Sequence, residues 1–244
     1  MKQIFLSVLD IIFPCECVYC GDLISSSQCH LCRECSTLLK KINDCCPVCS
    51  GIISDGVCSI CSDRKFYPAM NRTLFSYENV SKAVIHALKF SGIKHIYKIF
   101  IPYIAEEIKN IAEEIEKFNE NIDIITSVPM SRKKMIRRGY NQSKLIAKET
   151  GKLTGIEFCE TLKENSKAKQ QRSLNYDERF INVIDRYKTI NNAKFENKVV
   201  LIIDDVFTTG ATINECSRIL LLSGAAKIFS ITLVRSDLRK LEKI

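Results

Sequence analysis

The stretch KVVLIIDDVFTTGATINECSRILLLSG, residues 198–224, decides the fold of this chain. The apolar run at residues 199–203 predicts a strand that is buried on both faces, as in a parallel sheet. Residues 213–222 carry apolar side chains at helical spacing and end before Gly224, which predicts a helix. A buried strand followed by a helix indicates an α/β fold, with a parallel sheet flanked by helices.

The turn between this strand and this helix carries the chemistry. Asp204 and Asp205 follow the apolar run, and the residues that lead into the helix are Thr208, Thr209, Gly210, Ala211 and Thr212. Backbone N–H groups and hydroxyls at a helix N-terminus form a cradle for an anion. Gly210 permits the positive φ or the close approach that wrapping a phosphate needs. The two carboxylates can accept hydrogen bonds from neighbouring hydroxyls, and a phosphate beside a cis-diol describes a 5-phosphoribosyl group.

Other phosphate-binding folds compete weakly with this interpretation. The sequence contains neither G-x-x-x-x-G-K-[ST] nor G-x-G-x-x-G, so a P-loop and a dinucleotide fold are excluded. An acid pocket of the receiver type remains a weaker alternative. The whole string resembles the signature of type I phosphoribosyltransferases. That resemblance implies that Asp204 and Asp205 hold the ribose hydroxyls of phosphoribosyl pyrophosphate, and that residues 208–212 hold its 5-phosphate.

A basic stretch follows a second predicted strand. The segment NIDIITSVP, residues 121–129, predicts a buried strand; MSRKKMIRRGYNQS comes next, and then a helix over residues 141–153. Parallel strands end at a common edge of the sheet, so the cations of this stretch are expected to approach the pyrophosphate of the same ligand. A solvated surface stretch is the alternative. The cations are Arg132, Lys133, Arg137 and Arg138.

If the domain is active, Mg²⁺-bound phosphoribosyl pyrophosphate is expected to lose pyrophosphate through an oxocarbenium-like transition state. The cations and the metal would stabilise that state without a dedicated nucleophile. The candidate catalytic residues are Arg132, Arg138, Asp204 and Asp205. The candidate ligand-binding residues are Asp204, Asp205, Thr208, Thr209, Gly210, Ala211, Thr212 and Lys133.

Three further segments complete the predicted domain. Residues 80–90 and 97–118 have apolar residues at helical spacing, so His86 and His95 are expected to be packing or surface residues rather than catalysts. Residues 163–180 are polar and follow no period. Such a segment predicts a mobile loop of the kind that closes over a reactive ligand.

The N-terminal quarter of the chain is rich in cysteine. Eleven of the thirteen cysteines lie between Cys15 and Cys61. Two residues between thiolates let both sulfurs reach one ion, and two such turns complete a tetrahedron. Pairing in chain order predicts two structural zinc sites, with an iron-sulfur cluster or free thiols as alternatives. The predicted ligands are Cys17, Cys20, Cys32 and Cys35 for the first site, and Cys46, Cys49, Cys58 and Cys61 for the second.

The register of these ligands has alternatives. Cys15, Cys29 and Cys45 sit beside the C-x-x-C pairs, and His30 is a suitable ligand. For these four residues, packing is the favoured interpretation over metal ligation.

Composition bounds the remaining possibilities. The chain has 244 residues, 46% of them apolar and 26% charged, which is typical of a globular protein. Residues 1–14 predict an amphipathic helix, because the run is interrupted by Asp10 and is too short to span a bilayer. With no transmembrane segment or secretion signal evident, a cytoplasmic location is expected, where clustered thiols usually bind metal.

Charge divides the chain in the same place as the cysteines do. Residues 1–70 hold six Lys and Arg and seven Asp and Glu, which gives this part a net charge of −1. Because the whole chain has a net charge of +8, the remaining residues have a net charge of +9. Two Zn(Cys)₄ centres would bring the N-terminal part to about −5. Any contact with single-stranded DNA is therefore expected in the basic C-terminal domain. The predicted domains are residues 1–68, an amphipathic helix and double zinc ribbon, and residues 69–244, a phosphoribosyltransferase-like domain.

Several motifs in order resemble the ComF family, which joins a double zinc ribbon to a phosphoribosyltransferase-like domain. They are an apolar helix running into FP, the C-x-x-C pairs, LKFSG at 88–92, VP at 128–129, RGYNQS at 138–143, the set Gln171, Leu174, Arg179 and Asn182, and IIDDVFTTGAT. The resemblance implies a role in natural transformation, handling incoming single-stranded DNA on the cytoplasmic side beside a helicase partner.

The resemblance to phosphoribosyltransferases departs at one position. Purine-salvage enzymes usually have an acid where this chain has Thr208, which makes purine salvage doubtful. Two alternatives to a DNA-uptake role remain open. One is a metabolic transferase acting on a nucleobase or another amine, and the other is a catalytically silent sensor of phosphoribosyl pyrophosphate.

Overall fold

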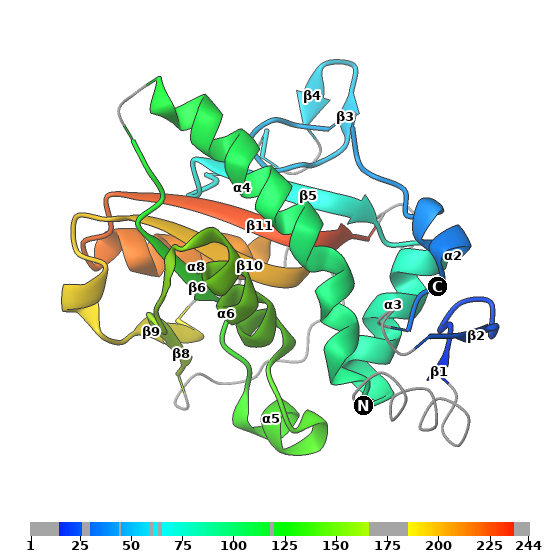
Figure 1. Ribbon diagram of the computed structural model, residues 1–244. Coiled ribbons are helices and arrows are strands. Elements are labelled where there is room, and N and C mark those ends of the chain that lie inside the picture. Colours follow the sequence, from blue (N-terminus) through cyan, green and yellow to red (C-terminus); the bar gives the residue numbers. More distant parts are fainter. Residues whose placement is uncertain are drawn as a thin grey trace.

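A parallel sheet forms the centre of the computed structural model, which describes residues 15–25, 30–43, 45–58, 61–62, 65–117, 120–165 and 185–236 (Figure 1). In this part of the chain the sheet has five strands in the order β5-β11-β10-β6-β7, all of them parallel. The strands are β5 (Met70–Ser76), β6 (Ile124–Ser127), β7 (Glu157–Phe158), β10 (Val199–Phe207) and β11 (Lys227–Arg235).

Helices connect these strands, and those predicted near residues 80–90, 141–153 and 213–222 are present. They are α3 (Asn79–Phe90), η2 (Lys94–Phe100), α4 (Ile101–Glu116), α5 (Arg132–Arg138), α6 (Gln142–Thr154), η3 (Asn192–Lys194) and α8 (Ala211–Leu222). One predicted helix forms in two pieces. Residues 97–100 belong to the 3₁₀ helix η2, and α4 begins only at Ile101, with a proline in its first turn. Proline is favoured there because the first helical N–H groups have no partner within the helix.

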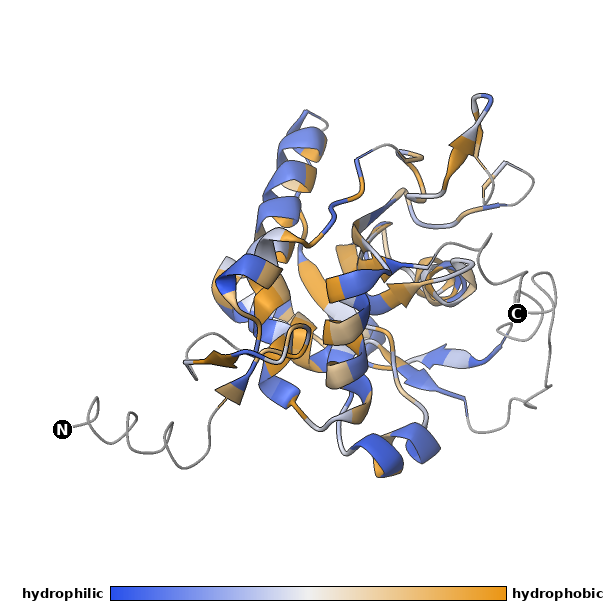
Figure 2. Ribbon diagram, turned by 90° about the vertical axis from the view of Figure 1, so that its right-hand side faces the viewer, coloured by the Kyte–Doolittle hydropathy of each residue, from blue (hydrophilic) through white to orange (hydrophobic). Residues whose placement is uncertain are grey.

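The central strand β10 separates two apolar layers. Leu201 and Ile203 pack against α3, α4 and α6, whereas Val200 and Ile202 pack with α8. Successive side chains of a strand point to opposite faces, so a continuous apolar run fills both layers. Figure 2 shows this distribution, with hydrophobic residues on the central strands and hydrophilic residues along the outer sides of the helices.

The cysteine-rich part straddles one edge of the sheet. Its first half contains the hairpin of β1 (Cys15–Glu16) and β2 (Leu23–Ile24) and helix α2 (Arg33–Thr37), and it packs into the layer of α3. Its second half contains the hairpin of β3 (Ile53–Ser54) and β4 (Val57–Cys58), and it packs into the layer of α8. Figure 1 shows the two halves at separate places around β5. The division at residue 68 stays a prediction.

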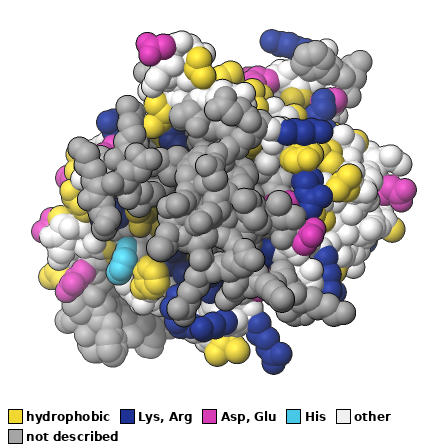
Figure 3. All heavy atoms as spheres, turned by 180° about the vertical axis from the view of Figure 1, so that it is seen from behind, with side chains coloured by type: hydrophobic (Ala, Val, Ile, Leu, Met, Phe, Trp, Pro, Cys, Tyr) yellow, Lys and Arg dark blue, Asp and Glu magenta, His cyan; other side chains and the backbone are white. Residues whose placement is uncertain are grey.

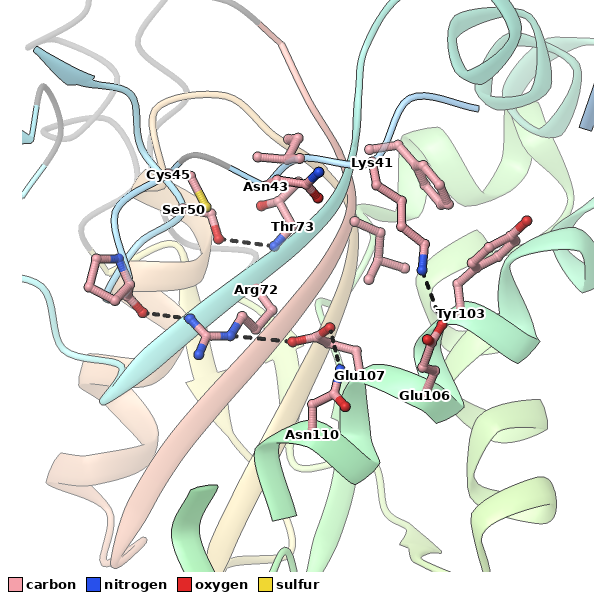
Figure 4. A pocket seen from close by; sticks show the side chains of 14 residues that line it. Lys41, Asn43, Cys45, Ser50, Arg72, Thr73, Tyr103, Glu106, Glu107 and Asn110 are labelled. Atoms are coloured by element: carbon pink, nitrogen blue, oxygen red, sulfur yellow. Dashed lines mark hydrogen bonds and ion pairs between the residues drawn. The ribbon is translucent and has the colours of Figure 1, made fainter. Parts of the chain in front are cut away.

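The segment between the two halves covers the edge strand β5. Ile42 N donates to Leu74 O, Ser76 N donates to Lys40 O and Asn71 N donates to Val48 O. Arg72 fixes this arrangement: it donates to Pro47 O at 2.8 Å and forms an ion pair with Glu107 of α4 (Figure 4). It forms a second ion pair with Glu114 of the same helix. An edge strand that would otherwise expose unpaired backbone groups is thereby closed.

Some predicted features fall outside the described residues. These are the helix over residues 1–14, Cys29, and most of the predicted loop at residues 163–180. Residues 163–164 of this predicted loop belong to the strand β8 (Leu162–Glu164), which pairs antiparallel with β9 (Tyr187–Thr189).

Candidate functional site

Two adjacent carboxylates lie near the carboxyl end of the central strand. Strand β10 continues to Phe207, so Asp204 and Asp205 belong to the strand rather than following it. Both are buried, with 8% and 6% of their surface exposed. Burying a carboxylate is unfavourable unless partners compensate its charge, so the groups that face these acids define the site.

Partners from two helices reach the acids. Ser143 Oγ donates to Asp204 Oδ1 at 2.9 Å, and Gln142 Nε2 donates to Asp205 Oδ2; both donors belong to the first turn of α6. Lys89 Nζ, near the end of α3, lies 2.9 Å from Asp205 Oδ2. The backbone N–H of Asp205 also donates to Asp204 Oδ1 at 2.9 Å.

The two acids differ in how well their surroundings stabilise the negative charge. Burial, followed by the neighbouring charge of Asp205, raises the pKa of Asp204 to about 7. The charge of Lys89 lowers the pKa of Asp204. Because Lys89 contacts Asp205 and not Asp204, this effect only partly offsets the rise in pKa caused by burial. Asp204 therefore exchanges a proton in the neutral pH range, whereas Asp205 has a cationic partner in direct contact.

The residues Thr208 to Thr212, here called the TTGAT loop, turn the chain from β10 into α8. Gly210 is the N-cap of α8 and has a φ of +79°. A Cβ at this position would lie 2.7 Å from Phe207 Cζ, so both the backbone conformation and the space require glycine. Thr209, Gly210 and Ala211 are buried, and Ala211 N donates to Thr209 Oγ1 at 3.3 Å. The predicted strand-to-helix turn is present, with Gly210 at positive φ.

The basic stretch forms a helix that the sequence analysis did not predict. Helix α5 begins after Ser131, whose side chain accepts from Lys134 N, and ends at Gly139 in the left-handed region. Arg138 donates to Gln142 Oε1 at 2.6 Å, and its guanidinium lies 5.6 Å from the centre of the Phe90 ring. Because Gln142 also bonds Asp205, Arg138 is linked to the acid pair through one side chain.

The other predicted cations lie outside this network. Arg132, Lys133 and Arg137 are exposed on α5 and form no ion pair with Asp204 or Asp205. Figure 3 shows lysine and arginine side chains at the lower end of the molecule, the end where α5 lies in Figure 1. These cations extend the positive surface away from the acids.

Four residues near the acids were missed by the sequence analysis as site residues. Gln142 and Ser143 lie in the motif RGYNQS and Lys89 in LKFSG, and their types alone do not distinguish them from ordinary helix residues. The fourth is Lys134: desolvation, followed by repulsion from Arg186 and Arg138, lowers its pKa, and attraction to Asp205 opposes that shift. The position of these groups depends on how α3, α5 and α6 meet β10, which no local pattern encodes.

The eight predicted cysteine ligands form two groups. Within each group, the sulfurs of Cys17, Cys20, Cys32 and Cys35, and of Cys46, Cys49, Cys58 and Cys61, lie within 4.8 Å of one another. We call them the first and the second cysteine cluster. The sulfurs of Cys20 and Cys32 are 3.8 Å apart and those of Cys46 and Cys61 are 3.6 Å apart. An ion with Zn–S bonds of about 2.3 Å requires sulfurs roughly 3.8 Å apart, so both clusters could hold a zinc ion.

Among the described residues, the extra donors Cys15, His30 and Cys45 are not members of either cluster. Cys15 Sγ lies 3.0 Å from His30 Nδ1, and these two residues contact each other. Backbone N–H groups point at ligand sulfurs instead: Cys35 N donates to Cys32 Sγ and Gly51 N to Cys49 Sγ, each at 3.3 Å. The geometry thus supports the register predicted from the C-x-x-C pairs.

A cavity of about 510 Å³ lies elsewhere, between α4 and the segment that covers β5. Its lining includes Lys41, Cys45, Tyr103 and Glu106, and Figure 4 shows its charged side chains paired with one another. Neither the acid pair nor the TTGAT loop lines it. We therefore assign no chemistry to this cavity.

Comparison with known proteins places the chain among the relatives of competence proteins. It is 26% identical to competence protein ComFC of Streptococcus pneumoniae, over 90% of this chain and all of that protein. The resemblance to the ComF family is confirmed. The chain is also 25% identical to the DNA utilization protein YhgH of Escherichia coli, over 88% of this chain and 94% of that protein. No family model matches it.

The fold class rests on the sheet and the turn described above. Among solved structures, the chain is similar to an adenine phosphoribosyltransferase, with 16% identity and a TM-score of 0.39 over 62% of this chain and 75% of that one. In the described residues, no helix has the length and apolar character needed to cross a membrane.

Proposed function

We propose that this chain binds phosphoribosyl pyrophosphate, supplied with Mg²⁺, at the acid pair and the TTGAT loop. The observation that carries the proposal is the buried pair Asp204 and Asp205 near the carboxyl end of β10, followed within one turn of chain by a left-handed glycine, Gly210, at the start of α8. Carboxylates accept hydrogen bonds from two ribose hydroxyls, and the amides and hydroxyls of the loop donate hydrogen bonds to the oxygens of the 5-phosphate. Lys89 and Arg138 supply positive charge for the pyrophosphate beside the same acids.

Calorimetric titration of phosphoribosyl pyrophosphate with Mg²⁺ into the zinc-loaded protein tests this proposal. Saturable binding is expected for the wild type and its loss for the double variant Asp204→Asn, Asp205→Asn. The matched control is Asp123→Asn: Asp123 lies at the opposite end of β10, where its carboxylate accepts from Val199 N at 2.8 Å. Absence of binding by a folded, zinc-loaded wild type would refute the proposal.

We propose further that the protein serves DNA uptake on the cytoplasmic side of the cell, as a ComF-like factor. Its similarity to proteins named for competence and DNA utilization supports this role. The exposed cations Arg132, Lys133 and Arg137 offer a positive surface suited to the backbone of single-stranded DNA. A helicase would be the natural partner of such a factor.

Fluorescence anisotropy with a labelled single-stranded oligonucleotide tests the DNA part of the proposal. Binding is expected to weaken steeply as salt rises and to be lost when Arg132, Lys133, Arg137 and Arg138 are changed to alanine together. The control variant is Lys109→Ala and Lys117→Ala, which removes two exposed cations from the region of α4. Binding that survives the α5 changes but disappears with the cysteine clusters would overturn the charge argument.

Transfer of the phosphoribosyl group to a nucleobase or another amine is a second candidate function. It is favoured by Asp204, because a carboxyl with a pKa of about 7 can exchange a proton at neutral pH. Pyrophosphate release in the presence of a panel of bases and amines would support it. Ligand binding without release on any acceptor would favour a sensor, in which the ligand regulates contacts with a partner.

A further inference from the structure

Asn214 joins helix α8 to the segment that follows the second cysteine cluster. It is buried one turn after Gly210, and its backbone N–H donates to Gly210 O at 2.8 Å. Both polar atoms of its side-chain amide form hydrogen bonds: Oδ1 accepts from Tyr67 N at 2.7 Å, and Nδ2 donates to Lys65 O at 3.1 Å. The short segment at residues 65–67, which begins four positions after Cys61, is thus held against the start of α8.

Phe66, between these two hydrogen-bonded residues, lies against the TTGAT loop. Its ring packs into the apolar layer that contains Cys46, Cys49 and the start of α8. A Cβ on Gly210 would lie 3.4 Å from Phe66 Cε2, which places the ring in contact distance of the loop backbone. The hydrogen bonds of Asn214 therefore hold an aromatic ring in place behind the loop.

A second connection runs from the same cluster to the same loop. Ser50, the residue after Cys49, accepts a hydrogen bond on its carbonyl from Arg235 Nη1. Arg235 is the neighbour of Phe207 across β10 and β11. The Phe207 ring in turn occupies the space beside Gly210. Two separate paths from the second cluster thus meet at one glycine.

The first cysteine cluster has a different environment. Its buried members Cys17, Cys32 and Cys35 belong to the apolar layer of α3, α4 and α6. The hydrogen bonds to its sulfurs come from within this half: Cys32 N donates to Cys17 Sγ and Cys35 N donates to Cys32 Sγ. Both clusters have four cysteine ligands, but they pack into different apolar layers. The first cluster is therefore an internal control for effects of the second cluster on the TTGAT loop.

We infer that Asn214 is a positioning residue that couples the second cysteine cluster to the TTGAT loop, so that a metal ion in this cluster strengthens phosphate binding at the loop. Zinc, when bound, cross-links Cys46, Cys49, Cys58 and Cys61 and thereby fixes the chain on both sides of Ser50 and before Phe66. The inference rests on the proposed binding of phosphoribosyl pyrophosphate. The inference adds that the geometry of the TTGAT loop depends more on the second cysteine cluster than on the first.

Calorimetry on the full-length protein tests the coupling. Asn214→Leu keeps the volume of the side chain but removes both hydrogen bonds, and it is expected to weaken phosphoribosyl pyrophosphate binding about tenfold, which corresponds to roughly 1.4 kcal/mol. Asn110→Leu, an exposed site on α4, is the matched control. Cys58→Ser with Cys61→Ser should weaken binding similarly, and Cys17→Ser with Cys20→Ser should weaken it much less.

A double-mutant cycle separates positioning from general damage. Combined with the Cys58 and Cys61 changes, Asn214→Leu should add little, because the path is already broken. Combined with the Cys17 and Cys20 changes, it should have its full effect. Equal losses from both cysteine pairs, or unchanged affinity in Asn214→Leu, would overturn the inference. If the cysteine variants do not fold, Phe66→Leu in the zinc-loaded protein takes their place, and a wild-type affinity would count against the coupling.

Hydrogen exchange gives a readout that needs no ligand. Faster amide exchange at residues 208–215 is expected after loss of Cys58 and Cys61, and not after loss of Cys17 and Cys20. A wild type that fails to bind phosphoribosyl pyrophosphate would refute the proposed function while leaving this measurement to decide the coupling. Equal exchange in the two cysteine variants would refute the coupling by itself.

Discussion

At the scale of single residues, Asp204 is a buried carboxyl group whose surroundings disfavour its charged form. Its pKa is raised by burial to about 7, against about 3.9 for an unfolded chain. Between these pH values the folded protein keeps a proton that the unfolded chain releases, so the free energy of unfolding falls as pH rises from 4 to 7 and stays lowered above 7.

Asp204→Asn is therefore expected to stabilise the protein at pH 8 by roughly 1–3 kcal/mol and to have little effect near pH 4. The amide oxygen of asparagine can still accept from Ser143 Oγ and Asp205 N, so the change removes mainly the charge. Urea denaturation at the two pH values measures the difference. A gain of equal size at both would contradict the assigned titration, and Asp123→Asn is the control.

Gly210 and Gly139 offer a matched pair for a second prediction. Both have a φ of +79°, but a Cβ at Gly139 meets no atom within 4 Å, whereas one at Gly210 meets Phe207 at 2.7 Å. Gly139→Ala should lower the free energy of unfolding by about 1 kcal/mol, from backbone strain alone. Gly210→Ala should lower it by roughly 1–3 kcal/mol more, through overpacking. Equal losses in chemical denaturation would show that the loop can move away from Phe207.

At the scale of elements, helix α3 brings a cation to a strand end that lies far from it in sequence. Lys89→Met should weaken phosphoribosyl pyrophosphate binding about tenfold or more, because it leaves Asp205 without its ion-pair partner and removes a cation from the site. It should also shift the pH midpoint of binding upward, since Lys89 lowers the pKa of Asp204. Calorimetry across pH measures both effects. Lys82→Met, an exposed position on the same helix, should change neither.

The sequence predicted the long elements better than the short ones. Helices α3, α6 and α8 follow from apolar spacing, and β10 from its continuous apolar run. Helix α5 was missed because RKKMIRR has too few apolar residues to reveal a period. Its ends carry a signal that would have found it, a serine N-cap at Ser131 and a left-handed Gly139.

At the scale of the whole molecule, the cysteine clusters belong to the cores on both sides of the sheet. Chelation is expected to lower the melting temperature markedly, because buried thiols would lose the ion that orders them in both layers. Thermal melts with EDTA, and with EDTA followed by excess zinc, check this; the second treatment should restore stability. Metal analysis should find two zinc ions per chain, one for each cluster. Iron in place of zinc, or a melt indifferent to chelation, would contradict the assignment.

Local motifs could be predicted from the sequence, whereas contacts between residues far apart in the chain could not. The ligand sets of both clusters followed from C-x-x-C spacing, because that geometry is local. The order of the strands and the covering of β5 were not predicted, since they depend on contacts such as that between Arg72 and Glu114, whose partners lie far apart in sequence. The acids and the glycine of the candidate site are adjacent in one sequence motif and could be named from it. The contacts of Lys89 and Gln142 with Asp205 could not, because they join residues far apart in sequence.

The contacts of Ser50 and of residues 65–67 also set an order of assembly. Ser50 is bonded to a residue 185 positions later, and Tyr67 to one 147 positions later. A ribosome makes the cysteine-rich part before helix α8 and strand β11. The second cysteine cluster can acquire metal early, since its ligands are close in sequence, but it can dock only when the sheet is complete. The cysteine-rich part is thus made before the sheet on which it docks.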